Sequence, residues 1–190
     1  MKAGNFLVSL MLENGIIEQD EIEVYGFGVQ LLLETLFSFA VFFIIAALLG
    51  ILWEFIVFMA AFALLRQYAG GFHAKTFLRC LFISCIIVSL LYPPLKFTGD
   101  GTAFICIGSV VSLPVIAVLS PVDSVYKPIA EDERKKYRKR LIILLTVEVA
   151  AVIVTVFCFD HIYAVCIVYA WCVLALSLAV GRISNKRLGR

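Results

Sequence analysis

The sequence predicts an all-α integral membrane protein with about six transmembrane helices. Of its 190 residues, 63% are hydrophobic and only 16% are charged, which leaves too little polar surface to cover the core of a soluble domain. The charges are also clustered, so that Thr35–Trp53 and Ile162–Gly181 contain none. Apolar runs of about 20 residues match the hydrocarbon thickness of a bilayer. We therefore expect one membrane domain over residues 1–190.

Six apolar segments are candidates for membrane spans. None shows the polar stripe at helical period that is typical of a surface helix in a soluble protein. The second segment is short and has Glu54 near one end, so a re-entrant hairpin is the alternative there. The predicted spans are Phe27–Leu49, Ile51–Leu65, Leu78–Leu95, Thr102–Leu119, Leu141–Phe159 and Ile162–Val180.

Lysine and arginine residues indicate which ends of these spans face the cytoplasm. If the N-terminus lies inside and the spans alternate, every lysine and arginine except Lys96 falls in an inner segment. The positive-inside rule predicts this asymmetry, so both termini are expected on the cytoplasmic side. Because the apolar stretch Phe6–Leu12 is too short for a cleavable signal, we expect residues 1–26 to form an amphipathic helix along the inner interface.

The inner loop 120–140 is the only sizeable soluble segment that the sequence predicts. Its part Val122–Arg140 holds seven basic and four acidic residues. Two interpretations stay open. The basic run can orient the protein and contact anionic lipid head groups. Alternatively, it binds an acidic peptide tail, with Lys135, Lys136 and Lys139 as the substrate-binding side chains.

Five of the six cysteines are interpreted as small apolar residues within spans. They form no CxxC pair and show no metal-ligand spacing. These five are Cys85, Cys106, Cys158, Cys166 and Cys172. Cys80 differs because it stands at the predicted membrane edge, seven residues after His73.

The segment 66–80 between the second and third spans holds the candidate chemistry. The pair Gly70-Gly71 breaks the second helix, and His73 and Cys80 follow it. Glycine allows close backbone approach and could present N–H groups to an oxyanion. No cofactor or metal is expected, because one cytoplasmic histidine and one nearby cysteine are too few ligands for zinc.

Helix geometry limits how His73 can act. Thr76 is the expected N-cap of the third helix, which places Cys80 one turn into it, where the helix dipole and the cations Lys75 and Arg79 favour the thiolate. On one straight helix seven residues span about 10.5 Å, whereas general-base contact needs roughly 3–3.5 Å. We therefore expect His73 on a loop that folds back over the helix start. The other histidine, His161, falls on the outer side and cannot be the partner.

These residues resemble the signature of the accessory gene regulator B (AgrB-like) proteins, the membrane endopeptidases of peptide quorum sensing. The family pattern has an arginine, a glycine pair, a His-Ala pair and a cysteine seven residues after the histidine. The residues that match it in order are Arg66, Gly70, Gly71, His73, Ala74 and Cys80. A second stretch, Pro121–Ser124 followed by Lys127–Ile129, also resembles the family.

The resemblance implies a cysteine peptidase. Cys80 would attack a carbonyl of a short precursor peptide (AgrD-like), with His73 as the base, and hold the peptide as a thioester. An internal nucleophile of the peptide, typically a cysteine, would then close a ring and give an autoinducing peptide. The implied partners are this precursor and membrane lipids, without nucleic acid, and the sequence leaves a homodimer open.

The group that orients His73 stays open at this stage. The candidates are Glu34 and Glu148, which lie about seven residues inside the inner ends of their spans, and Gln67 and Asp123, which lie in the inner segments. Arg66 is either a bidentate clamp for a carboxylate or a plain interface anchor. Two other functions remain as alternatives, namely a small transporter or exporter without peptidase chemistry and a membrane scaffold or sensor.

Overall fold

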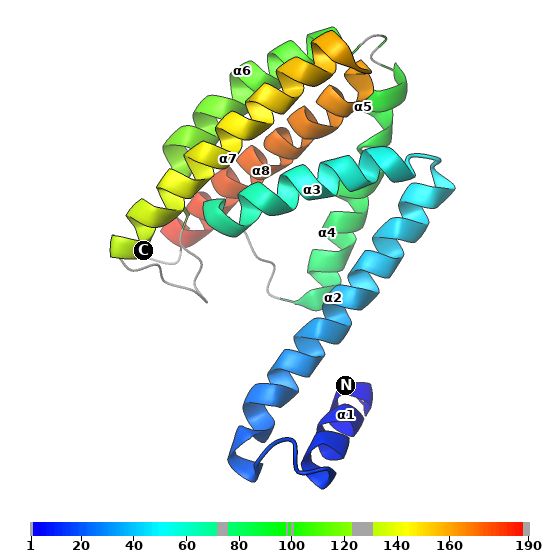
Figure 1. The fold of residues 1–190 in the computed structure, drawn as a ribbon, viewed down its shortest axis with the longest axis vertical. Helices are drawn as coiled ribbons and strands as arrows, with labels where there is room; N and C mark the ends of the chain where they lie inside the picture. The colour runs from blue at the N-terminus through cyan, green and yellow to red at the C-terminus, as the bar shows by residue number, and fades with distance from the viewer. Residues whose placement is uncertain (1, 72–75, 98, 100, 123–130, 188–190) are drawn as a thin grey trace. The chain divides into compact units, whose positions relative to one another are not determined.

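The computed structural model describes residues 2–71, 76–97, 99, 101–122 and 131–187, and all regular elements in these ranges are helical (Figure 1). Six helical stretches are long and apolar enough to cross a membrane. The predicted all-α class and the predicted number of spans are therefore confirmed. The stretches are Gln19–Leu48, Leu52–Ala69, Phe77–Lys96, Thr102–Leu119, Glu133–Cys158 and His161–Ser184.

The chain divides into two compact units, residues 1–44 and residues 45–190. The first unit holds α1, the short 3-10 helix η1 and most of α2. Val8 and Ile17 are buried in this unit, whereas Phe6 is exposed. The bounds are Lys2–Glu13 for α1, Gln19–Glu21 for η1 and Ile22–Leu48 for α2. The first long helix thus begins before the predicted start at Phe27, because the acidic residues ahead of that position are helical as well.

The second unit is organised around α8, the most buried of the six spans. It packs against α3, α6, α7 and the short α5. Trp171, Leu174 and Leu178 are among its buried side chains. The bounds are Leu52–Ala69 for α3, Phe77–Ser89 for α4, Tyr92–Phe97 for α5, Thr102–Leu119 for α6, Glu131–Cys158 for α7 and His161–Arg187 for α8.

The second span is one continuous helix and not a hairpin. α3 contains 18 residues, which corresponds to a length of about 27 Å. It extends past the predicted end at Leu65 because Arg66 and Gln67 continue the helix up to the glycine pair. A helix of this length favours a full crossing over the re-entrant alternative.

Contacts along α8 show the directions of its neighbours. α3 runs parallel to α8, since the rings of Phe58 and Tyr169 lie 5.4 Å apart and Arg66 reaches Ser177 further along both helices. α4 runs antiparallel, since the Tyr169 hydroxyl donates to the carbonyl of Ile87 at 2.8 Å while α5, which follows α4, lies near the start of α8. These directions agree with alternating spans. The orientation of the two termini stays a prediction.

Small residues allow α6 and α8 to approach closely. A Cβ built on Gly108 of α6 would lie 2.6 Å from Cγ1 of Val168, so no larger residue fits without a shift. Ser112, one turn further along α6, is buried and donates to the Gly108 carbonyl at 2.6 Å. Such contacts are typical of helix packing in membranes.

Candidate active site

The end of α3 is shaped by the predicted glycine pair. Gly70 caps the helix with a φ of 71°, and Gly71 has a φ of 125°. Both values lie in the region that only glycine adopts readily. A Cβ on Gly70 would overlap the carbonyl of Val122, and a Cβ on Gly71 would overlap the guanidinium of Arg66. These two positions therefore need glycine for both conformation and space.

Arg66 folds back over the end of its own helix. Its Nη1 donates to the carbonyl oxygen of Gly70 and, at 2.8 Å, to Oγ of Ser177 on α8. The guanidinium is half-buried between α3 and α8. Two of its partners are thus neutral oxygens. Ser177 could not be predicted as this partner, because nothing in a lone serine within an apolar span indicates a contact 111 residues away.

The start of the inner loop is fastened to the same helix end. The Val122 N–H donates to the carbonyl of Ala69 at 2.9 Å, which forms an isolated bridge between Gly70 and Val122. Arg134 on α7 also donates to the carbonyl of Pro121 at 3.3 Å. Residues of α3, α7, α8 and the loop after α6 thus meet at one end of the second unit. His73 and Asp123 lie outside the described residues.

Cys80 lies where the sequence predicts it, one turn into α4. Thr76 holds the N-cap position with an extended backbone, and the Cys80 N–H donates to its carbonyl at 3.1 Å. The Thr76 side chain makes no capping hydrogen bond, so only the backbone part of the cap prediction is confirmed. The Cys80 side chain is exposed, which leaves its thiol accessible to a substrate.

Cys80 and Arg66 lie toward the same end of the second unit. Cys80 precedes Ile87 by seven residues, or about 10.5 Å of helix, and Ser177 follows Tyr169 by eight, or about 12 Å. Because Ile87 and Tyr169 are in contact and their helices are antiparallel, both sites lie in the same direction from that contact.

His161 lies toward the opposite end. It lines a pocket of about 180 Å³ together with Pro94, Leu95 and Asp160. Pro94 lies in α5, beyond the end of α4 at Ser89, and the part of α4 from Cys80 to Ser89 alone spans about 13.5 Å. This separation agrees with the expectation that His161 is not the partner of Cys80.

Of the two intramembrane glutamates, Glu148 has a defined buried partner. Its Oε2 accepts a hydrogen bond from Nε1 of Trp171 at 2.7 Å, and its Oε1 has no partner among the described residues. Trp171 precedes Ser177 by six residues, which puts this pair about 9 Å nearer the start of α8 than the Arg66 contact. Glu34 belongs to the first unit, where its Oε1 accepts from Gln30 at 2.9 Å.

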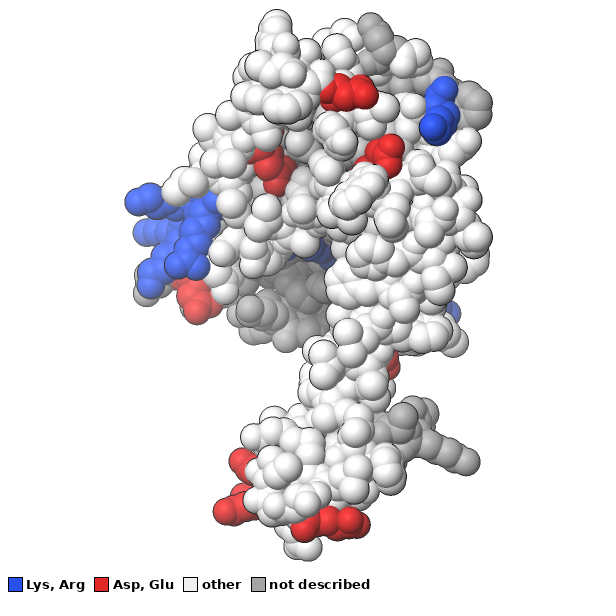
Figure 2. Space-filling model, turned by 45° about the vertical axis from the view of Figure 1, so that its right-hand side comes forward, with Lys and Arg blue, Asp and Glu red and all other residues white. Residues whose placement is uncertain are grey.

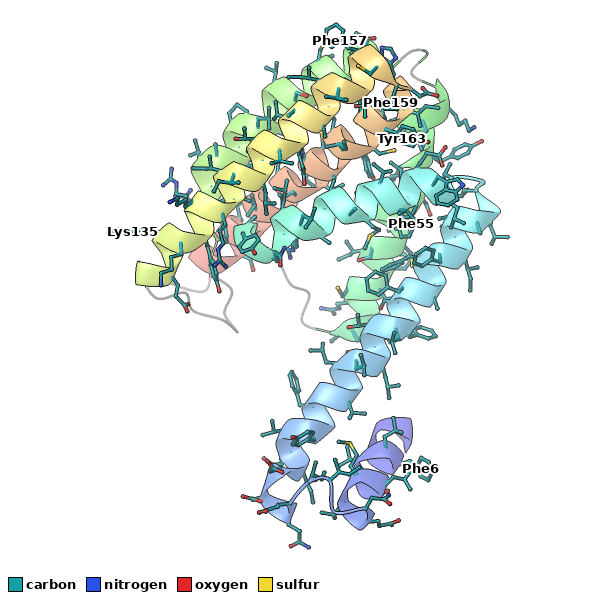
Figure 3. All side chains as sticks on the ribbon, in the orientation of Figure 1. Phe6, Phe55, Lys135, Phe157, Phe159 and Tyr163 are labelled. Carbon is teal, nitrogen blue, oxygen red and sulfur yellow. The ribbon has the colours of Figure 1, made fainter. Side chains whose placement is uncertain are left out.

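The three predicted substrate-binding lysines are exposed at the start of α7 (Figure 2, Figure 3). This helix runs without a break from Glu131 into the fifth span, so it begins ten residues before the predicted span start at Leu141. Aromatic contacts join it to α3, since the rings of Tyr68 and Tyr137 lie 6.0 Å apart and Arg140 stands 5.8 Å from the Tyr68 centroid. The lysines are Lys135, Lys136 and Lys139.

Comparison with known proteins assigns the chain to a family. The family model described as accessory gene regulator B matches residues 4–178, from the first turn of α1 to Leu178 in α8. The chain belongs to the accessory gene regulator B (AgrB) family. As a member of the AgrB family it is a multi-pass membrane protein involved in agr quorum-sensing peptide processing, and its implied partner is an AgrD-like precursor peptide.

Two relatives from Clostridium perfringens support this assignment. An AgrB-like protein of strain SM101 is 29% identical over 148 residues, which cover 72% of this chain and 69% of the relative. AgrB-like protein 2 of strain 13 is 26% identical over 148 residues, with the same coverage of 72% and 69%. No solved structure matches the chain.

The glycine pair yields a direct test of this AgrB site. We expect Gly70→Ala and Gly71→Ala each to lower precursor processing at least about ten-fold, because a side chain there clashes and strains the backbone. Gly28→Ala is the matched control, since its Cβ would meet nothing within 4 Å. Processing is measured as precursor conversion on a gel at equal protein level. Unchanged processing by both variants would show that this backbone geometry is not needed.

Proposed function

We propose that this AgrB protein is a cysteine endopeptidase that cleaves the C-terminal part of its precursor through a thioester on Cys80. One observation carries the proposal. An exposed cysteine stands on the first turn of α4, toward the same end of the second unit as the contact of Arg66 with Gly70 at the end of α3. The four residues 72–75 between these two elements include His73. A nucleophile and a candidate base are thus linked by a very short connection.

Chain connectivity supports pairing of His73 with Cys80. His73 follows Gly71 by two residues and precedes Thr76 by three. The described residues on either side of it are therefore close in sequence, with Gly71 at the end of α3 and Thr76 at the start of α4. The first turn of α4 carries Cys80, so this short connection is compatible with a reaction in which His73 serves the Cys80 thiol.

The reaction has two transfers. In the first, His73 takes the proton of the Cys80 thiol, Sγ bonds to the scissile carbonyl carbon, and the C–N bond breaks as His73 returns the proton to the leaving amine. In the second, His73 takes the proton of the internal thiol of the peptide, and that sulfur displaces Cys80 from the carbonyl. The ring closes and Cys80 regains a proton. Thioester exchange needs no external energy source.

The membrane-edge position of the site suits this chemistry. Water competes with the internal thiol for the thioester, and a site that excludes water favours ring closure. The described basic residues of the second unit gather on the side of the proposed site, at the start of α7 and near Arg66, whereas Lys96 lies on the opposite side. By the positive-inside rule, this arrangement supports a site on the cytoplasmic side of the membrane.

Asp123 is the candidate that connectivity favours as the orienting group for His73. It directly follows Val122, whose N–H is bound at Ala69, and consecutive Cα atoms lie about 3.8 Å apart. Glu148 instead accepts from Trp171, about 9 Å nearer the start of α8 than the Arg66 contact. A carboxylate next to the α3 end would fix the tautomer of the imidazole and stabilise its protonated form.

Substitution of the catalytic pair tests the proposal. We expect Cys80→Ala and His73→Ala each to abolish precursor cleavage while membrane insertion stays normal, because nucleophile and base are both required. Cys85→Ala is the matched control one and a half turns further along α4 and should cleave almost normally. Each variant is co-expressed with the precursor, and the peptide is followed on a gel. Full cleavage by Cys80→Ala would exclude the peptidase, and a transporter would then be the better explanation.

The three lysines of α7 are proposed to capture an acidic precursor tail. Their attraction is long-ranged and screened over about 8 Å at physiological salt, so it should affect capture more than the chemical step. We expect the triple variant Lys135→Gln, Lys136→Gln and Lys139→Gln to raise KM several-fold and to leave kcat mostly intact. Lys96→Gln is the control for loss of a basic residue elsewhere. A KM at low salt equal to that of the wild type, in correctly inserted protein, would leave the lysines as orientation signals only.

A further inference from the structure

The hydroxyl of Ser177 has an unusual use for a serine within a span. Most described serine and threonine hydroxyls in the spans donate to a carbonyl of their own helix, as Ser89 does to Cys85 and Ser112 does to Gly108. Ser177 instead accepts a hydrogen bond from Arg66 on another helix at 2.8 Å. Its neighbours Leu174 and Leu178 are fully buried. The Ser177 hydroxyl therefore faces α3 from a fixed position on α8, the most buried of the six spans.

Ser177 and Arg66 also define the space next to the glycine pair. A Cβ on Gly71 would lie 2.9 Å from Oγ of Ser177 and would overlap the Arg66 guanidinium. The same Nη1 that binds Ser177 binds the carbonyl of Gly70. The serine hydroxyl, the guanidinium and the backbone of residues 70 and 71 thus form one packed group. A displacement of the guanidinium would alter the packing against both glycines.

We propose that Ser177 is a positioning residue of the peptidase reaction, which holds Arg66 against Gly70 and Gly71 and so fixes the path by which the chain leaves α3 toward His73. This inference rests on the proposed function. Ser177 touches neither substrate nor reacting atoms in this scheme. It acts through Arg66, and Arg66 acts through the backbone two residues before the base. A small error in the position of a base is costly, since a misplacement of about 1 Å can lower a rate by about 100-fold.

The isosteric pair Ser177→Thr and Ser177→Val isolates the hydroxyl. Threonine and valine have nearly the same shape, so both add the same methyl group to α8 and differ in the acceptor for Arg66. We expect Ser177→Thr to keep kcat within about two-fold of the wild type, and Ser177→Val to lower kcat about ten-fold. KM for the precursor should be similar in both variants, because the capture residues are untouched. Cleavage is measured on purified, detergent-solubilised protein. Only variants whose thermal stability equals that of the wild type are compared.

Two controls separate positioning from general packing. Ser89→Thr and Ser89→Val make the same changes at a hydroxyl that donates to the Cys85 carbonyl of its own helix. We expect these two variants to have equal kcat values. In a double-mutant cycle, Ser177→Val should have little further effect in the Arg66→Lys background, because both changes disrupt the same contact. Equal kcat values for Ser177→Thr and Ser177→Val, or fully additive effects with Arg66→Lys, would overturn the inference. If wild-type protein itself failed to cleave the precursor, the proposed function would fail instead.

Discussion

The contact between Arg66, Gly70 and Ser177 is the constraint on which the proposed site depends. It turns the chain out of α3 through two backbone conformations that only glycine adopts easily, and it ties this turn to the most buried span. Val122 adds a second tie from the loop after α6, through the carbonyl of Ala69. A site at a membrane edge lacks a surrounding core, so its loops need such anchors on rigid helices. Here three segments far apart in the sequence supply them.

In the proposed mechanism, the membrane edge gives the site a chemical advantage. A thioester intermediate survives only if ring closure is faster than hydrolysis, and a peptide held at the lipid interface would keep its own nucleophile at high local concentration while water is limited. Cys80 suits this proposed role because it is exposed on the first turn of the third candidate membrane span, Phe77–Lys96. The basic start of α7, joined to α3 through Tyr68 and Tyr137, stands on the same side as the anchored turn.

The features of the fold that could be predicted from the sequence are those set by hydropathy and by helix-breaking residues. The six spans follow from apolar runs, and the end of α3 and the start of α4 follow from Gly70-Gly71 and Thr76, whose effects are local. The partner of Arg66 could not be predicted, because it depends on how α3 and α8 are rotated about their axes. The partner of Glu148 could not be predicted for the same reason. The sequence indicates how far Glu148 lies inside its span, but not that its side chain points toward Trp171. The interruption between α4 and α5 was also missed, since apolar residues continue through it.

The most direct measurement of the central claim is the mass of the enzyme during turnover. A precursor whose internal nucleophile is replaced by alanine cannot close a ring, so the acyl-enzyme should accumulate. The account predicts an adduct with the mass of the acyl part of the precursor, located on the peptide that contains Cys80 and released by hydroxylamine, as a thioester requires. Cleavage of the precursor without any adduct on the protein, or with an adduct on another cysteine, would contradict a mechanism centred on Cys80.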